Sequence, residues 1–303
     1  MKIYKGRPYD EYYSFLDTIS PKSESLPQYA HHDHLEGLRG RMKLEIQAIS
    51  PVFVGTGEYE VDSQGIYQPF ARTGGRLVIP GTTIKGVVRT YAEALSPSCE
   101  GGRCDVSKGK VCIACRIFGA LGFQGRVTFC DTEGLDPNEV KLRKYTMSVR
   151  WSGRRRDGRR FYYHNKPTSQ ILVNSKTGKP LPEERVEVVP KGTRFTSELI
   201  FENLSNEEMG LLLLAMGLSP KHRFDLKLGG GKNRRLGSVR FHLPSGINVA
   251  GNDIYTSFAP EYEVKDICTW GTEAVDCYLS GLSKEHKALV MEFIRAFQKD
   301  PDS

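Results

Sequence analysis

Residues 42 to 48 have the sequence MKLEIQA, and this stretch decides how the chain begins its fold. Every second side chain in it is apolar, and the side chains between are charged or polar. A period of two is typical of a strand that buries one face and exposes the other. We therefore predict a half-buried strand over residues 41–49, and the other elements are placed relative to it.

The next regular segment toward the carboxyl end is Ile79–Leu95, with the sequence IPGTTIKGVVRTYAEAL. A Pro-Gly pair precedes it, and its apolar residues recur at the spacing of one helix face: Ile84, Val87, Val88, Tyr91 and Leu95. Thr82 or Thr83 can cap the amino end with its hydroxyl. The segment therefore predicts a helix that packs one face on the strand.

Further elements follow along the chain. Ser205 and Glu208 fit a capping box that starts a helix reaching about Gly217, and Ser283–Gln298 is a second amphipathic helix. Strand-like segments occupy residues 126–130, 185–189, 193–201, 224–228 and 238–243. This order predicts an α+β domain, with a mostly antiparallel sheet and helices on one face. A ferredoxin-like or RRM-like core is the simplest arrangement.

The composition supports a folded, water-soluble protein. Of 303 residues, 39% are hydrophobic and 26% are charged, which is too apolar for a disordered chain. The longest apolar run, Gly210–Leu218, is far shorter than the ~20 residues of a membrane span. The first 15 residues lack the apolar segment of a secretory signal. We expect a cytoplasmic protein and exclude the membrane, fibrous and secreted classes.

The net charge of +7 is unevenly distributed. Residues 141–166 hold a single acid, Asp157, among basic residues that include Arg150, Arg154, Arg155 and Arg156. Aromatic residues are interleaved with them: Tyr145, Trp151, Phe161, Tyr162 and Tyr163. Cations neutralise phosphates and aromatic faces stack on bases, so this region predicts a contact with single-stranded nucleic acid. The alternative is a solvated, flexible basic loop.

Four of the seven cysteines are close together in the sequence: Cys99, Cys104, Cys112 and Cys115. A pair separated by two residues forms one corner of many tetrahedral zinc sites, and the glycine-rich loop between the cysteines cannot build a core. We predict structural Zn²⁺, with free loop cysteines as the alternative. Cys130, Cys268 and Cys277 are predicted to be buried thiols.

Two segments have the composition of phosphate-binding loops. The start of the 79–95 helix offers free N–H groups beside Thr82, Thr83, Lys85 and Arg89. The second segment combines glycines with cations: Gly230, Gly231, Lys232, Asn233, Arg234 and Arg235. It is not a Walker A loop, because Leu226 and Asn233 occupy the required Gly and Ser/Thr positions, so an NTPase is not expected. The alternatives are a capped helix with a surface lysine and a basic hairpin turn.

No nucleophile–base motif of a known hydrolase is present. The carboxylate that stands out is Asp62, in the loop after the first strand. An aspartate there can position a nucleophile or a metal, although most loop aspartates do neither.

Taken together, these segments resemble the RAMP (repeat-associated mysterious protein) superfamily, and specifically backbone subunits of type III, type III-D-like, CRISPR effector complexes. The resemblance rests on five segments in order: ISPVFVGTG at 49–57, IPGTTIKGVVRT at 79–90, CRIFGALGFQGRVTFCD at 115–131, VVPKGTRF at 188–195 and LGGGKNRRLGSVRF at 228–241. It covers about residues 41–243 and leaves both ends unmatched.

The composition of the two ends and the resemblance of the middle together predict a domain organisation. Residues 1–40 would be an extension, partly ordered at best. Residues 41–245 would be an RRM-like core that carries a zinc-binding insertion at 96–118 and a basic "thumb" hairpin at 141–182. Residues 246–303 would form a C-terminal extension with a terminal helix.

The resemblance also implies a function in antiviral defence. Several copies would stack as a filament along a CRISPR guide RNA, held by the helix start and the glycine loop, and each thumb would kink the guide–target duplex. Complementary target RNA and other effector subunits, including a separate nuclease, would be partners in this ribonucleoprotein.

One departure from the family pattern concerns catalysis. Slicing members carry an Asp in a segment resembling I-D-x-P, where this chain has Ile66-Tyr67-Gln68-Pro69. Tyrosine cannot replace that carboxylate, so we predict a scaffold that does not slice. The alternative is a Mg²⁺-dependent endoribonuclease with Asp62 as the working carboxylate. A third option is a stand-alone zinc-containing RNA-binding protein.

Overall fold

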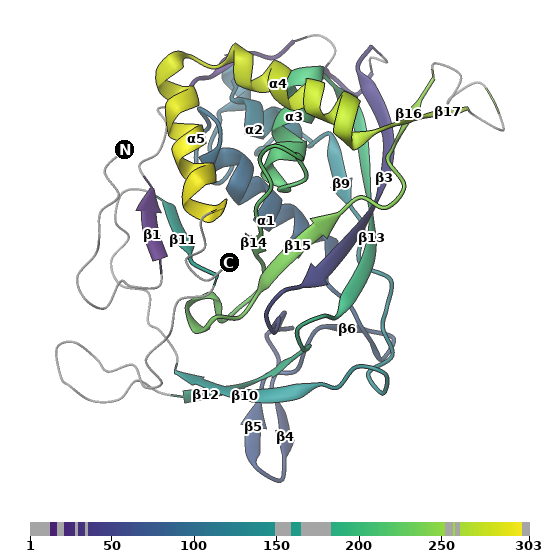
Figure 1. Cartoon of the computed structure of the whole chain (residues 1–303), viewed down its shortest axis with the longest axis vertical. Coiled ribbons are helices and arrows are strands. Elements are labelled where there is room, and N and C mark those ends of the chain that lie inside the picture. Colours follow the sequence, from purple (N-terminus) through teal and green to yellow (C-terminus); the bar gives the residue numbers. More distant parts are fainter. Residues whose placement is uncertain are drawn as a thin grey trace.

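Figure 1 shows the chain as a computed structural model, which describes residues 13–16, 21–27, 30–33, 36–148, 159–164, 183–251, 257 and 261–298. The main sheet has the strand order β14–β15–β3–β13–β9, and all neighbours are antiparallel. These strands are β3 (Leu38–Ala48), β9 (Val127–Phe129), β13 (Arg194–Leu204), β14 (Leu226–Lys227) and β15 (Ser238–His242). A hairpin of β16 (Ile247–Ala250) and β17 (Tyr262–Lys265) extends the sheet through pairing of β16 with β3.

The connectivity of this core is ferredoxin-like. Along the chain come β3, α1 (Gly81–Ala94), β9, β13, α3 (Asn206–Ala215) and β15. The corresponding spatial order, β15–β3–β13–β9, is that of a βαββαβ unit. Helices α2 (Ile113–Phe118), α4 (Thr272–Gly281) and α5 (Lys284–Gln298) complete a helical layer over one side of the sheet (Figure 1). The predicted α+β class is confirmed.

The central strands form where the sequence alternates. On β3 the side chains of Met42, Leu44 and Ile46 are buried, and the residues between them face outward. The partner strand β13 places Leu199 opposite Met42, so that the apolar faces of both strands meet the helices. The predicted strand over 41–49 is confirmed, although it begins a few residues earlier.

The helix starts were predicted with mixed success. The capping box of Ser205 and Glu208 on α3 is present. The prediction that Thr82 or Thr83 caps α1 is wrong, because Pro80 is the N-cap residue and makes no side-chain cap. Instead, Asp131 accepts a hydrogen bond of 2.7 Å from the Gly81 N–H. A carboxylate that follows β9 thus replaces the local hydroxyl.

Helix α3 is buried on all sides between the sheet, α1 and α4. Its Gly210 allows a close crossing, because a Cβ atom there would lie 2.0 Å from the carbonyl oxygen of Ala274 on α4. Helix α4 has no counterpart among the predicted elements, whereas α5 occupies the predicted segment. Within the described part of the chain, no helix is long and apolar enough to cross a membrane.

The basic region at 141–182 was predicted to be one projecting hairpin, but part of it packs on the core. Near its start, β10 (Arg143–Ser148) pairs with β12 (Glu183–Val188), which directly follows the region, and the two strands form a stem. Between them, β11 (Arg159–Tyr162) pairs with β1 (Tyr13–Leu16), and Phe161 is buried against Tyr91 and Phe293. The apolar ring of Phe161 draws this part of the region into the core.

Short strands connect other segments. The β2 strand (Glu24–Ser25) of the N-terminal extension pairs with β8 (Lys110–Val111) in the cysteine insertion. Two small hairpins precede α1: β4 (Glu60–Asp62) with β5 (Gly65–Tyr67), and β6 (Arg72–Thr73) with β7 (Arg76–Leu77). Part of the extension thus lies along the cysteine loop.

Candidate metal centre and nucleic-acid interface

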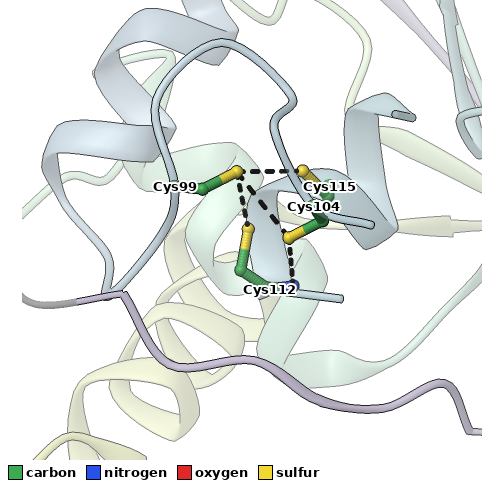
Figure 2. A group of neighbouring side chains, drawn as sticks. All are labelled: Cys99, Cys104, Cys112 and Cys115. Atoms are coloured by element: carbon green, nitrogen blue, oxygen red, sulfur yellow. Dashed lines mark hydrogen bonds between the residues drawn. The ribbon is translucent and has the colours of Figure 1, made fainter. Parts of the chain in front are cut away.

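The four clustered cysteines meet at one point (Figure 2). Cys99 Sγ lies 3.4 Å from Cys115 Sγ and 3.7 Å from both Cys104 Sγ and Cys112 Sγ. All four sulfur atoms are within 4.8 Å of one another, and no pair is bonded as a disulfide. The predicted convergence of these four residues is confirmed.

Local structure explains the convergence. Cys99 follows the end of α1, and a loop with a 3-10 turn at Val106–Lys108 leads back through β8. Cys112 is the N-cap residue of α2, and Cys115 lies one turn later, so the two-residue spacing directs both sulfurs to the same side. The Cys112 N–H also points at Cys104 Sγ, at 3.2 Å. The loop is therefore folded around the sulfur atoms.

The donor set fits a tetrahedral divalent metal. Zinc–sulfur bonds of about 2.3 Å place the sulfurs of a tetrahedron about 3.8 Å apart, close to the separations found here. A hydrogen bond with Cys115 lowers the pKa of Cys112, whereas burial raises the pKa of Cys99. Without a cation, like-charge repulsion keeps the cluster from ionising fully. Four close cysteines could thus hold a metal such as zinc.

The other three cysteines take no part in this cluster. Cys130 is half-buried, and both Cys268 and Cys277 are exposed, so the prediction of three buried thiols is wrong. Cys268 and Cys277 both lie on the outer face of their helical turns.

Arg89 lies at the cysteine cluster. Its Nη2 donates toward Cys115 Sγ at 3.6 Å, and its Nε donates to Glu93 at 2.8 Å. Arg89 was predicted to be one of the RNA-binding residues of the 79–95 helix. The spacing of Arg89 and Glu93 could have indicated a helical ion pair, but no local signal places that pair beside the cysteines.

The start of α1 is less open than its sequence suggests. The Gly81 N–H is occupied by Asp131, while the Thr82 side chain is exposed and that of Thr83 half-buried. Lys85 Nζ donates to the backbone oxygen of Val127 at 3.0 Å. Burial lowers the pKa of Lys85. The exposed first turn can still meet an anion, while Lys85 is held against β9.

The glycines of the 229–237 loop pack against the protein itself. A Cβ atom on Gly229 would lie 2.0 Å from the backbone oxygen of Phe53, and one on Gly230 would lie 2.8 Å from the Phe53 ring. The Gly230 N–H donates to the same Phe53 oxygen at 2.9 Å. Close approach of two backbones, the property that suggested phosphate binding, is here used within the fold.

The polar part of the loop follows these glycines. Gly231 has a φ of 65°, and Lys232, Asn233 and Arg234 form a 3-10 turn. Burial lowers the pKa of Lys232, and within the described part of the chain no acid or hydrogen-bond acceptor pairs with its ammonium group. The Asn233 side-chain nitrogen is also buried without a partner there. An anion at this turn would satisfy both donors.

Arg235 ends the turn in a strained conformation. Its φ of 61° is in the left-handed region, where an ordinary side chain costs roughly 1–3 kcal/mol. Such residues cluster at functional sites. The arginine is exposed, so its side chain reaches solvent beside Lys232.

Asp62 is fully engaged by cations. Its two oxygens accept bonds of 2.9 and 3.0 Å from Arg185 and one of 2.7 Å from Lys144. The Gln64 N–H adds a bond of 2.8 Å. Arg185, and then Lys144, hold the pKa of Asp62 well below its usual range. The carboxylate fastens the β4–β5 hairpin to the β10–β12 stem.

Tyr67 completes this ionic network. Its ring is buried with Lys144 Nζ 3.4 Å from the ring centroid, a cation–π contact, and its hydroxyl donates to Glu60. The hydroxyl is therefore occupied by a carboxylate of the β4–β5 hairpin. The remaining predicted nucleic-acid contacts, Arg150, Arg154, Arg155 and Arg156, lie outside the described residues.

Comparison with known families matches this architecture. A model of the RAMP superfamily matches residues 45–240, which include α1, the cysteine cluster and the glycine loop. The chain belongs to the RAMP superfamily. Membership gives this RAMP protein a CRISPR-associated RNA-binding role, since proteins of the superfamily generally bind CRISPR RNA within multi-subunit complexes. No curated protein matches the chain.

Proposed function

We propose that this RAMP protein is a non-slicing backbone subunit of a type III, III-D-like, CRISPR effector. Several copies would form a filament on one guide RNA, and the basic 141–182 region would kink the duplex of guide and target. Target cleavage would then belong to a separate nuclease subunit.

The observation that carries the non-slicing part is the state of Asp62. A carboxylate that organises Mg²⁺ or an attacking hydroxyl needs free oxygen lone pairs. Those of Asp62 accept from Arg185, Lys144 and the Gln64 N–H. Tyr67 is buried in the position where slicing relatives are expected to carry their aspartate. An active Asp62 would have to exchange both cations for a metal.

Guide binding is supported by the 232–235 turn. Lys232 is a half-buried cation whose ammonium group finds no anion in the described structure, and strained Arg235 lies beside it. A phosphodiester backbone supplies anions at regular spacing without reading sequence, which suits a subunit that must accept any guide. Thr82 and Thr83 on the first turn of α1 offer a second contact.

The four cysteines would bind Zn²⁺ in a structural role. Four thiolates close the coordination shell of zinc, which leaves no open position for substrate. The metal would organise a loop that has little apolar content of its own. It would thus shape the surface of the protein without taking part in chemistry.

The decisive experiment purifies the full chain from cells that express a CRISPR array and the neighbouring genes. Co-purifying RNA is sequenced, and complementary RNA is then offered with Mg²⁺. We expect repeat-derived guide RNA and an intact target in complexes that lack any other nuclease. Cleavage at regular intervals that disappears in Asp62→Ala would establish the endoribonuclease alternative instead. Absence of guide RNA would favour a stand-alone RNA-binding protein.

Lys232→Ala tests the turn directly. Loss of one phosphate contact should weaken guide binding and reduce the slope of log affinity against log salt by about one unit. The matched control is Lys287→Ala, which removes an exposed lysine of α5. Filter binding over a salt series measures both variants. Equal slopes for Lys232→Ala and the control would remove Lys232 from the interface.

A further inference from the structure

We infer that Arg89, oriented by Glu93, is the positioning residue of the cysteine metal centre and not a contact to RNA. The inference deepens the proposed zinc site and rests on it. It assigns to the first helix a second task, which is to supply the hydrogen-bonding shell around the metal-bound sulfurs.

The guanidinium of Arg89 is fixed in three directions. Its Nε donates to Glu93 Oε1 at 2.8 Å, Nη1 to the Gly119 oxygen at 2.9 Å, and Nη2 toward Cys115 Sγ at 3.6 Å. The first contact lies on α1, the second just after α2, and the third within α2. The planar fork therefore connects both helices to a ligand atom.

Glu93 connects the same group to the cysteine loop. Its side chain is only 3% exposed, and both of its oxygens lie 3.1 Å from the Gly101 N–H. Gly101 lies between Cys99 and Cys104. One carboxylate oxygen thus holds Arg89. Both oxygens accept from the Gly101 N–H and so hold the ligand-bearing loop. A side chain added at Gly102 would collide with Arg89 Nη2 at 2.8 Å, so the loop wraps closely around the guanidinium.

The contacts of Arg89 can offset the negative charge of a metal bound by four thiolates. A divalent metal with four thiolates carries a net charge of −2, which is unfavourable where two of the sulfurs are fully buried. Hydrogen bonds to coordinated sulfur withdraw that charge and fix the direction of the lone pairs. Arg89 supplies such a bond to Cys115, and the Cys112 N–H supplies one to Cys104.

Arginine suits this position better than lysine. The site needs three donors in one plane, aimed at a carboxylate, a carbonyl and a sulfur, and the guanidinium provides them at fixed angles. A lysine ammonium could hold the charge but could not reach all three acceptors. The same geometry explains why Arg89 is only 20% exposed although it lies on a surface helix.

The test compares full-length, metal-loaded Arg89→Met, Arg89→Lys and Glu93→Gln with wild type, and Arg103→Met, at an exposed arginine of the same loop, is the control. Zinc release to the chelator 4-(2-pyridylazo)resorcinol is timed, and the sulfur-to-cobalt absorption band is recorded after replacement by Co²⁺. Loss of an outer-shell partner typically changes metal affinity 10–100-fold. We expect Arg89→Met to release zinc ~10–100-fold faster and to shift the band, with smaller effects in Arg89→Lys and Glu93→Gln. The control should match wild type.

Several outcomes would overturn the inference. The inference would be overturned if Arg89→Met released zinc at the wild-type rate, or if the wild-type protein held no metal. Neither result would bear on the proposed guide binding. A reduced salt slope for guide RNA in Arg89→Met, with unchanged zinc release, would return Arg89 to the RNA interface. If Arg89→Met does not fold, the test uses the cobalt absorption bands of Glu93→Gln and Arg89→Lys. A band unchanged from wild type in both variants would count against a positioning role.

Discussion

The cysteine cluster and the 229–237 loop make an instructive comparison, because both stood out in the sequence as binding motifs. All four cysteines converge to within 4.8 Å, as their spacing suggested. The glycines of the loop instead pack on Phe53, and only the turn that follows them offers cations to a ligand. The cysteines come together as a group that could hold a metal, whereas the glycine motif is partly a packing device.

The difference follows from what each residue type can do. Clustered cysteines in a polar loop have few stabilising uses other than metal binding. Glycine reports only that something approaches closely, and the neighbour can be a phosphate or another part of the same chain. A glycine-rich motif therefore indicates that another group approaches the backbone closely, but it does not indicate whether that group is a ligand or part of the same protein.

The largest effect should come from removing a metal ligand, which tests the first half of the comparison. Cys112→Ser should abolish stoichiometric zinc and destabilise the protein by at least ~3 kcal/mol, because metal binding supplies folding energy to the loop. Elemental analysis and thermal unfolding measure the two effects. The matched control is Cys268→Ser at an exposed thiol, which should retain metal and stability. Equal metal content in both variants would mean that the cluster is not a metal site.

A smaller effect is expected at the glycine loop. Gly229→Ala forces a Cβ atom toward the Phe53 oxygen at a φ of 80°, so the free protein should lose about 1–3 kcal/mol of unfolding free energy. The control is Gly86→Ala, which adds a methyl group in open space on α1 and should stabilise the helix by up to ~1 kcal/mol. Denaturant unfolding without RNA separates the two uses of the glycine. An unchanged free protein with weakened guide binding would restore the phosphate interpretation.

How much the sequence could predict depended on how local the signal was. The alternation on β3, the apolar face of α1 and the Ser205–Glu208 box are written within one element, and each was predicted correctly. The cysteine site needed only a short loop to close. These features use interactions between residues that are near each other in the chain.

Interactions across long separations could not be predicted in this way. Asp62 meets Lys144 and Arg185 from separate segments, so a loop carboxylate that looked available is neutralised. Asp131 replaces the threonines as the partner of the α1 start for the same reason. Phe161 lies within a basic run of the sequence, and no local pattern indicated that its side chain is part of the core. In each case tertiary packing supplied a partner that no local pattern contains.

The smallest effect concerns His164, a titratable residue that lies beside the glycine loop and is not part of the cysteine cluster. Its Nδ1 is 3.0 Å from the hydroxyl of Ser238, directly after the loop. Burial, with Lys227 adding to it, lowers the pKa of His164 to about 4. The folded state therefore keeps a neutral imidazole, while the unfolded chain binds a proton below about pH 6.5. Stability should fall by about 1 kcal/mol between pH 6.5 and 5.5, and further toward pH 4.

His164→Gln should flatten that part of the stability curve. The metal centre also responds to acid, because protonated thiols release zinc, but it contributes equally to wild type and variant. The difference between their unfolding free energies over pH 4–8 therefore isolates His164. A difference that grows as the pH falls below 6.5 would show that the loop region has its own acid-sensitive anchor. Parallel curves would mean that His164 contributes nothing to the acid sensitivity of the fold, and that the loop region has no acid-sensitive anchor at this residue.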